Sequence, residues 1–234
     1  MAAGEGRRLR PLTERWAKPV LAIDGRPVVA TLLRELAGAG FEEIWIVVGH
    51  LAETIERLLG DGSGFGIRLR YGRQREQLGS ADAVNVALAA GASPPLLVTA
   101  ADTVFAPGTV ADALSRWRES GTAGGLCVRP VRAEELPDRS SVRAEGDRVL
   151  AVREKPPPGT AEATLAGAPL WFLGPDVCRF LGDLPGPPYE LATAAQRAID
   201  AGLELAAIQI APTRDLTRPE DIVRHNFPYL WRDG

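Results

Sequence analysis

The sequence predicts an α/β fold with a mixed, mostly parallel sheet. Apolar residues recur at helical spacing in four segments, residues 28–36, 51–59, 80–90 and 110–117. Short apolar runs typical of buried strands alternate with them, at residues 44–48, 67–71 and 96–100. Helices placed between strands imply crossover connections, which make successive strands parallel.

The later part of the chain predicts antiparallel additions to this sheet. Residues 124–131, 141–144 and 148–153 have the pattern of strands joined by tight turns, and residues 203–210 that of a late strand. Thr217 and Glu220 have capping-box spacing, which predicts the start of a final helix. The chain has no internal repeat and no interdomain linker, so one domain is expected over residues 1–234.

Composition excludes several classes of function. The net charge of −3 argues against a general nucleic-acid binder, which needs a broad basic surface. No apolar run approaches the roughly 20 residues of a membrane-spanning helix, and Arg7 and Arg8 interrupt any signal-peptide core. Cys127 and Cys178 are isolated thiols, expected to be reduced and idle. A cytoplasmic protein that does not bind membranes is expected.

Lysine is rare in this chain. Of 27 basic residues only Lys18 and Lys155 are lysines, and the others are arginines. A bias toward arginine converts any lysine whose chemistry is unimportant, whereas a compact ammonium with freely rotating donors cannot be replaced by a planar fork. The two lysines are therefore candidate functional residues.

The opening segment could bind phosphate. Gly4 and Gly6 let the backbone pass close to a phosphate with its N–H groups facing the oxygens, and Arg8 and Lys18 could balance the charge. A Gly-x-Gly pair alone fits an ordinary tight turn equally well.

The whole segment resembles the signature of the sugar-1-phosphate nucleotidylyltransferases, L-A-A-G-x-G-T-R-L-x-P-L-T followed by P-K-P-L. The matching residues are Ala2, Ala3, Gly4, Gly6, Arg8, Leu9, Pro11, Leu12, Thr13, Lys18 and Pro19. The resemblance implies that the loop wraps a triphosphate, that Arg8 stabilises the leaving pyrophosphate, and that Lys18 reaches the reacting phosphates. Arg7 and Ala17 depart from the usual threonine and proline.

The same resemblance implies a Rossmann-like three-layer α/β/α fold of the GT-A-like nucleotidyltransferase type. Its first strand precedes the glycine loop, so that strand is expected to be missing from the chain as given. The resemblance also implies a nucleotide-binding half, residues 1–120, and a sugar-phosphate-binding half, residues 121–234.

Residues 73–81 resemble the base-reading loop of the family, Q-x-E-Q-L-G-T-A in uridylyltransferases. Gln74 is expected to pair with a pyrimidine, because a side-chain amide both donates and accepts hydrogen bonds. Gly79 would let the backbone approach the base, and Ser80 stands at the next helix start. A polar loop capped by Ser80 is the alternative interpretation.

Two aspartates match magnesium ligands of the family. Asp102 follows a buried strand, where open α/β folds bind ligands, and has Ala101 before it in place of glycine. Asp215 matches the second ligand within a looser resemblance to W-x-D-x-G-T-P-E-D. Carboxylate oxygens suit Mg²⁺, which also binds substrate phosphates.

The sugar end of the resemblance is weaker. Glu154 and Lys155 match E-K-P, which implies contacts to the sugar hydroxyls and to the sugar phosphate. Gly167 is retained in the following aromatic segment, but Leu165 stands where an asparagine is usual.

The predicted function is magnesium-dependent transfer of a nucleotidyl group from a nucleoside triphosphate, with a pyrimidine favoured, to a sugar 1-phosphate. Compact bacterial members acting on N-acetylmuramate 1-phosphate or mannose 1-phosphate are similar in length. A homo-oligomer is possible. The alternatives are a non-hexose acceptor, such as phosphocholine or a heptose phosphate, and a non-catalytic nucleotide or sugar sensor. A dinucleotide-dependent oxidoreductase is disfavoured, because Arg7 and Arg8 crowd the position of its third glycine.

Overall fold

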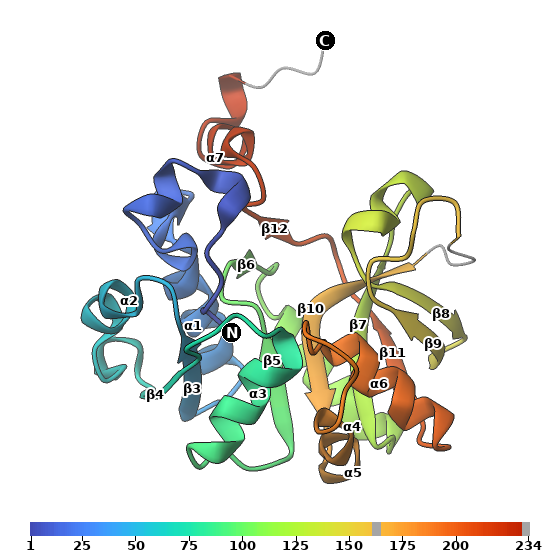
Figure 1. The fold of residues 1–234 in the computed structure, drawn as a ribbon. Coiled ribbons are helices and arrows are strands. Elements are labelled where there is room, and N and C mark those ends of the chain that lie inside the picture. Colours follow the sequence, from blue (N-terminus) through green and yellow to red (C-terminus); the bar gives the residue numbers. More distant parts are fainter. Residues whose placement is uncertain (161–164, 231–234) are drawn as a thin grey trace. The chain divides into compact units, whose positions relative to one another are not determined.

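The computed structural model describes residues 1–160 and 165–230. It divides into two compact units (Figure 1). Unit 1 comprises Met1–Gln77, Ala100–Ala111 and Pro212–Gly234, and unit 2 comprises Leu78–Thr99 and Asp112–Ala211. Each unit is therefore assembled from segments that are distant in the sequence. The expected single domain, with halves that meet at residue 120, stays a prediction.

Unit 1 is built around the parallel pair of strands β3 and β4. Its strands are β1 (Ala22–Ile23), β2 (Arg26–Pro27), β3 (Glu43–Val48), β4 (Arg68–Arg73), β6 (Thr103–Val104) and β12 (Arg214–Asp215). Its helices are α1 (Val28–Gly38), α2 (Ala52–Leu59) and α7 (Pro219–Asn226). Apolar residues at helical spacing bury one side of α1 and one side of α2 in a shared core with β3, including Leu33, Val48 and Ile55.

The first residues of the chain extend beside β3. Ala2 forms a parallel bridge with Val48, and its N–H donates to Val47 O at 2.7 Å. On the other side, the Ala101 N–H donates to Met1 O at 2.9 Å. Residues 1–3 thus lie where the resemblance places the end of the strand before the glycine loop.

Unit 2 contains a six-stranded mixed sheet with the order β5-β10-β7-β11-β9-β8. Its strands are β5 (Leu96–Thr99), β7 (Gly124–Pro130), β8 (Ser141–Glu145), β9 (Arg148–Arg153), β10 (Leu165–Leu173) and β11 (Leu205–Gln209). Its helices are α3 (Ser80–Ala89), α5 (Pro175–Cys178), α6 (Leu191–Asp200) and most of α4 (Thr109–Ser120).

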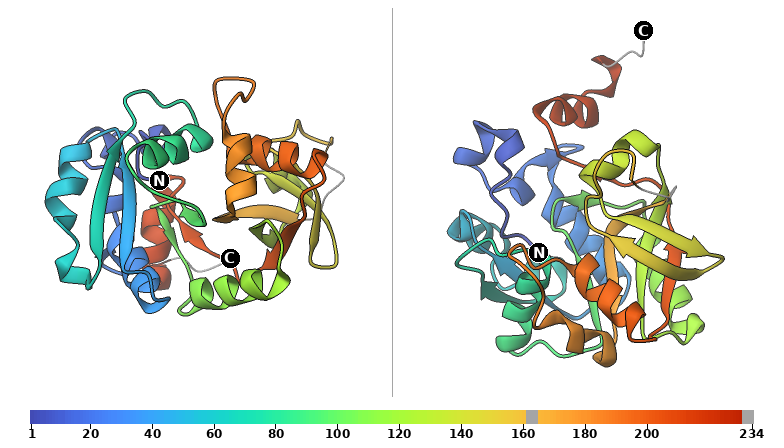
Figure 2. Two further views of the ribbon diagram at one scale, coloured as in Figure 1. Left: turned by 90° about the horizontal axis from the view of Figure 1, so that it is seen from below. Right: turned by 45° about the vertical axis from the view of Figure 1, so that its right-hand side comes forward.

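Helices cover both faces of this sheet (Figure 2). Gly124 and Gly125 are neighbours in β7, so their side-chain positions point to opposite faces. A Cβ on Gly124 would lie 3.0 Å from Val177 of α5, and one on Gly125 would lie 3.0 Å from Trp117 of α4. Trp117 also stacks on Phe172 of β10, with ring centroids 5.0 Å apart. The three-layer arrangement predicted for the fold is thus present in unit 2.

The predicted mixed α/β fold is confirmed, with fewer parallel pairs than expected. β3 pairs with β4, and β7 with β11, in parallel, but β10 runs antiparallel to both β5 and β7. β10 was expected as an aromatic strand, but its pairing with β5 joins residues 71 to 77 positions apart, which no local pattern encodes. The antiparallel additions β8 and β9 are confirmed.

The predicted cap of the last helix is wrong by one residue. Helix α7 begins at Pro219, close to the expected start, but Glu220 does not cap it. The Asp221 carboxylate instead accepts hydrogen bonds from the N–H groups of Thr217 and Arg218, at 2.8 and 2.7 Å. The Thr217 hydroxyl donates elsewhere, to Asp215. No helix within residues 1–160 and 165–230 is long and apolar enough to cross a membrane.

Candidate active site

The glycine loop of unit 1, residues 4–8, has a backbone conformation that requires glycine at position 6. Gly6 has a φ of +62°, and a Cβ there would approach Thr13 Cγ2 at 3.0 Å and Lys18 Cβ at 3.3 Å. A Cβ on Gly4 would meet nothing within 4 Å, so the backbone at Gly4 is open to a ligand. The buried Thr13 donates from its hydroxyl to Gly6 O at 3.0 Å. The loop is therefore closed on itself behind Gly6 and open at Gly4.

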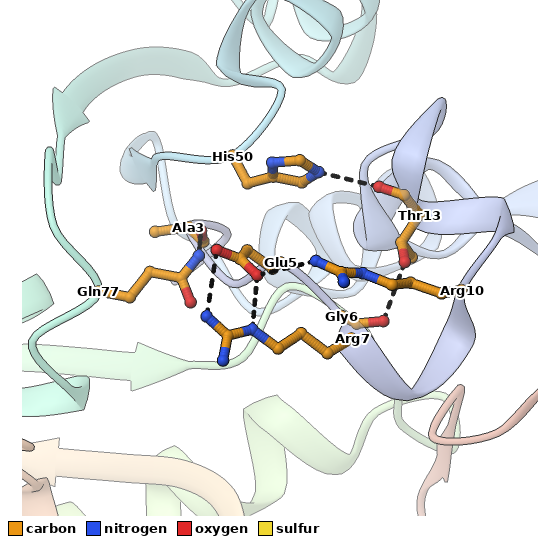
Figure 3. A network of polar contacts seen from close by, with 8 residues as sticks. All are labelled: Ala3, Glu5, Gly6, Arg7, Arg10, Thr13, His50 and Gln77. Carbon is orange, nitrogen blue, oxygen red and sulfur yellow. Dashed lines mark hydrogen bonds and ion pairs between the residues drawn. The ribbon is translucent and has the colours of Figure 1, made fainter.

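The base of this loop is tied to neighbouring segments of unit 1 (Figure 3). Ala3 O accepts hydrogen bonds from the His50 N–H at 3.2 Å and from Gln77 Nε2 at 3.3 Å. The His50 ring lies over the other end of the loop, with Nε2 2.9 Å from Thr13 O. Ala2 and Ala3 are both buried, and the Ala2 N–H and Ala3 O are hydrogen-bonded within unit 1, so the expected nucleotide contacts at these two positions stay a prediction.

A carboxylate lies within the loop between the two glycines. Glu5 forms an ion pair with Arg7 at 2.6 Å and a longer one with Arg10 at 3.4 Å. The hydrogen bond from Arg7 holds the pKa of the Glu5 carboxyl below its ordinary value. Glu5 is therefore ionised near neutral pH. Arg8, the predicted pyrophosphate-binding residue, is exposed in the short 3₁₀ turn Arg7–Leu9.

Lys18 and Asp102 form a direct ion pair. Their side chains are 21% and 22% exposed, so the pair is accessible and yet largely shielded from water. The preceding residue of each, Ala17 and Ala101, is buried in the same core cluster. Two buried small residues thus hold the two charged groups at one place, and both are departures from the family signature.

Asp215 lies in a strand that pairs with the residues just after Asp102. It pairs with Thr103 in the short antiparallel ladder of β12 and β6, next to Asp102 in the chain. The Thr217 hydroxyl donates to Asp215 Oδ1 at 3.3 Å. Leu216, after Asp215, and Leu9, after Arg8, are fully buried in one cluster. In unit 1 the neighbours of Lys18 and Asp102 thus share one buried cluster, and the neighbours of Arg8 and Asp215 share another.

The donor set fits a magnesium ion whose coordination is completed by substrate. Among residues 1–160 and 165–230, no group of three or more His, Cys, Asp or Glu side chains could hold a metal. Asp102, in the turn just before β6, and Asp215, in the β12 strand that pairs with β6, supply two hard carboxylates. Mg²⁺ is commonly held by one or two carboxylates together with water and substrate phosphates.

The predicted base-reading residues fall in different units. Gln74, in unit 1, is 6% exposed, and its N–H donates to Val48 O at 2.9 Å. Gly79, in unit 2, has a φ of +110°, and a Cβ there would lie 2.3 Å from Tyr189 O. Ser80 is the first residue of α3, and its hydroxyl donates to Glu190 Oε2 at 2.5 Å. The close approach that requires Gly79 is thus to the Tyr189 backbone.

The predicted sugar-phosphate residues form a cluster in unit 2. Lys155 Nζ lies 3.3 Å from Glu154 Oε1, and the Ser140 hydroxyl donates to the other oxygen of Glu154. The Gly167 N–H donates to Ser140 O at 2.8 Å. Leu165, in the position usually taken by asparagine, begins β10. The cluster therefore contains a carboxylate, an ammonium and one hydroxyl that Glu154 holds.

Sequence reasoning missed three residues that organise these sites. Ser140 orients Glu154, His50 holds the glycine loop, and Glu190 binds the start of α3. His50 and Ser140 are isolated polar residues without a motif around them. Glu190 could have been noticed, because it is an acidic residue directly before the Ala-rich segment 191–200. Acidic residues at such positions often accept hydrogen bonds at the start of a helix.

Comparisons with known proteins agree on one family. A model of the nucleotidyl transferase family matches residues 1–233. The low-salt glycan biosynthesis nucleotidyltransferase Agl11 of Haloferax volcanii is 26% identical over 97% of this chain, which spans 64% of that protein. The UTP–glucose-1-phosphate uridylyltransferase AglF of the same organism is 29% identical over 94% of this chain and 91% of its own length.

A solved structure supports the fold. UDP-glucose pyrophosphorylase complexed with UDP-glucose superimposes with a TM-score of 0.87 at 22% identity, covering 98% of this chain and 96% of that one. The chain thus spans less than two thirds of the first relative and nearly all of the second relative and of the solved structure.

Proposed function

We propose a reaction for this chain from one premise: it belongs to the nucleotidyl transferase family. The reaction is transfer of a nucleoside monophosphate from a nucleoside triphosphate to a sugar 1-phosphate, giving a nucleoside diphosphate sugar and pyrophosphate. We propose that residues 1–234 act as one nucleotidyltransferase domain. A supply of nucleoside triphosphate places this reaction in the cytoplasm.

The observation that carries the proposal is the group of charges around Lys18. Lys18, whose Cβ packs beside Gly6 of the glycine loop, forms an ion pair with Asp102, and Asp215 lies in the strand that pairs with the one after Asp102; these contacts support a site with an ammonium and two carboxylates. A simple nucleotide sensor has no need of two metal-binding carboxylates. A phosphoryl-type transfer does need them, because charge accumulates on the phosphate oxygens in its transition state.

The chemistry requires no protein nucleophile. A phosphate oxygen of the sugar 1-phosphate forms a new bond to the α-phosphorus, and the bond from that phosphorus to the β-phosphate bridging oxygen breaks. The bonding electron pair leaves with pyrophosphate. The attacking phosphate is already ionised near neutral pH, so a general base is not needed. Catalysis consists of positioning and charge stabilisation.

Residues of unit 1 are assigned to the nucleotide. The loop from Gly4, where the backbone is open, to Gly6 is expected to lie along the phosphates, with the backbone of Ala2 and Ala3 at the base of the loop. Arg8 would stabilise the leaving pyrophosphate, and the Lys18 ammonium would contact the α-phosphate. Both roles require a cation that is exposed or partly exposed, as these two are.

Asp102 and Asp215 are assigned to Mg²⁺. Bound there, the ion would neutralise charge on the phosphate oxygens of the reacting nucleotide. The two carboxylates provide only part of a magnesium coordination sphere, which leaves the remainder to water and substrate.

The remaining assignments concern the base and the sugar phosphate. Gln74 of unit 1 is proposed to favour a pyrimidine base, because its amide can both donate and accept hydrogen bonds. Gly79 and Ser80 of unit 2 are proposed, separately, as nucleotide-binding residues. Glu154 is proposed to bind sugar hydroxyls, Lys155 the sugar phosphate, and Gly167 to leave room beside them. The ion pair between Glu154 and Lys155 supports one common site for these two residues.

The test is magnesium-dependent release of pyrophosphate. UTP, dTTP, GTP and CTP are each combined with a panel of sugar 1-phosphates, with phosphocholine and a heptose phosphate as further acceptors. We expect release with a sugar 1-phosphate and a pyrimidine nucleotide. Lys18→Ala should abolish it, whereas Arg15→Ala, an exposed neighbour in the same segment, should not. Wild-type turnover in Lys18→Ala would contradict the proposal.

A further inference from the structure

We propose that His50 is a positioning residue that holds the glycine loop in the shape needed for nucleotide binding. The inference goes beyond the assigned reaction, and its kinetic test rests on the proposed function. His50 is hydrogen-bonded to Ala3, whose backbone is assigned to the nucleotide, and to Thr13, which is assigned to neither substrate. It acts through the backbone of residues that precede and follow the loop.

His50 is attached to the loop at two places. Its backbone N–H donates to Ala3 O at 3.2 Å, just before Gly4. Its ring Nε2 lies 2.9 Å from Thr13 O, at the far end of the loop (Figure 3). A single residue after β3 therefore fixes the distance between the two ends of the segment from residue 3 to residue 13.

Thr13 links His50 to Lys18 through Gly6. The Thr13 hydroxyl donates to Gly6 O at 3.0 Å, and its methyl group lies 3.0 Å from the position of a Cβ on Gly6. The same position lies 3.3 Å from Lys18 Cβ. Thr13 is 2% exposed, so it is the buried anchor of an otherwise accessible loop. Releasing Thr13 O would loosen the packing of Gly6 against Lys18.

The chemistry of the contact defines which side chains could replace histidine. Thr13 O can only accept a hydrogen bond, so Nε2 must carry the proton. Glutamine can place an N–H donor at a reach similar to that of Nε2. Asparagine is shorter and places its donor near the position of Nδ1, and leucine has no donor.

The consequence is a specific kinetic pattern. Without the bond to His50 the loop is mobile in the free protein and must become ordered when the triphosphate binds. The conformational entropy lost in that ordering weakens nucleotide binding. The KM for the nucleotide should therefore rise and kcat should fall, because Lys18 is less well positioned. The KM for the sugar 1-phosphate should not change, since its assigned residues are in unit 2.

The experiment compares His50→Leu, His50→Asn and His50→Gln, with His225→Leu as the control that removes the other histidine of the chain. We expect His50→Leu and His50→Asn to raise the nucleotide KM by about tenfold, as loss of one buried hydrogen bond would. His50→Gln should stay within about threefold of wild type, and His225→Leu should not differ from it.

Amide hydrogen exchange of the peptide that covers residues 4–13 is the second measurement. It should be faster in His50→Leu and His50→Asn than in His50→Gln or wild type, with the exchange of unit 2 unchanged. This measurement needs no turnover. If the wild-type chain releases no pyrophosphate, the proposed function fails, while exchange still tests His50. Wild-type exchange and kinetics in both His50→Asn and His50→Leu would overturn the inference. Faster exchange throughout the chain would also overturn it, because His50 would then be a general stabiliser.

Discussion

Each of the two lysines forms an ion pair with a carboxylate in a segment that is proposed to bind a substrate. Lys18 pairs with Asp102, and Lys155 lies 3.3 Å from Glu154. Elsewhere the chain uses arginine for its surface ion pairs, as in Arg73 with Glu53. A compact ammonium can exchange one oxygen partner for another without matching a planar geometry. This difference explains why lysine is retained at these two positions.

The hydroxyl of Ser140 leads to a prediction at the sugar end of the chemistry. It donates to one oxygen of Glu154, whose other oxygen faces Lys155. Ser140→Ala should leave Glu154 free to rotate, and the KM for the sugar 1-phosphate should rise by about three- to tenfold. The nucleotide KM, measured on the same enzyme, is the internal control. Equal changes in both constants would show that Ser140 does not act through Glu154.

At the scale of elements, α7 offers a test of which acidic residue caps it. Asp221, and not Glu220, accepts hydrogen bonds from the N–H groups of Thr217 and Arg218. Asp221→Ala should lower the opening free energy of α7 by about 1 kcal/mol, which is roughly fivefold faster amide exchange in that helix. Glu220→Ala is the matched control and should leave exchange unchanged. The opposite result would restore the capping box predicted between Thr217 and Glu220.

Two glycines in different elements should respond oppositely to alanine. A Cβ at Gly124 in β7 would lie 2.9 Å from Phe172 O and 3.0 Å from Val177. Gly124→Ala should therefore reduce the free energy of unfolding by about 1–3 kcal/mol. A Cβ at Gly38, the last residue of α1, would meet nothing within 4 Å. Gly38→Ala should be neutral or stabilise by up to about 1 kcal/mol.

Urea denaturation of the two glycine variants is the measurement. A Gly124→Ala protein as stable as wild type would mean that β7 can move away from β10 and α5 without loss. That would contradict the close packing found between these elements.

At the scale of the whole molecule, both thiols serve as reporters of an intact fold. Burial raises the pKa of Cys127 to about 12 and that of Cys178 to about 11. Both therefore remain protonated near neutral pH, and the thiolate is the reactive form. Cys127 of the native protein should react with a thiol-specific disulfide reagent about a thousandfold more slowly than in the urea-unfolded chain, and Cys178 about a hundredfold more slowly. Rapid labelling of Cys127 in a Cys178→Ala variant would contradict its complete burial.

Much of the element order could be predicted from sequence, because it depends on local periodicity. Residues 44–48 and 80–90 have patterns that one strand or one helix explains, and both elements are present. α6 was not predicted, because its buried face consists largely of alanines such as Ala194 and Ala198, which mark no clear apolar stripe. The division into two discontinuous units depends on pairings between distant segments, and local patterns do not encode these.

The residues of the candidate site likewise fall into those that local motifs predict and those that only the folded chain reveals. Lys18, Asp102 and Asp215 were identified from motifs; Lys18 forms an ion pair with Asp102, and Asp215 pairs with Thr103, the residue after Asp102. Ser140 and His50 act through single hydrogen bonds to residues 14 and 37 positions away, which only the folded chain reveals. Sequence patterns identified the charged groups assigned to the reaction but not the hydrogen-bonding side chains that hold Glu154 and the glycine loop.

The most direct test of nucleotidyl transfer to a sugar 1-phosphate is to identify the phosphorus-containing products. ³¹P NMR of the chain with Mg²⁺, a nucleoside triphosphate and a sugar 1-phosphate distinguishes nucleotidyl transfer from hydrolysis. We predict equal amounts of nucleoside diphosphate sugar and pyrophosphate with the wild-type chain, and neither product with Lys18→Ala. Nucleoside diphosphate and inorganic phosphate in place of these products, or unchanged product formation by Lys18→Ala, would contradict it.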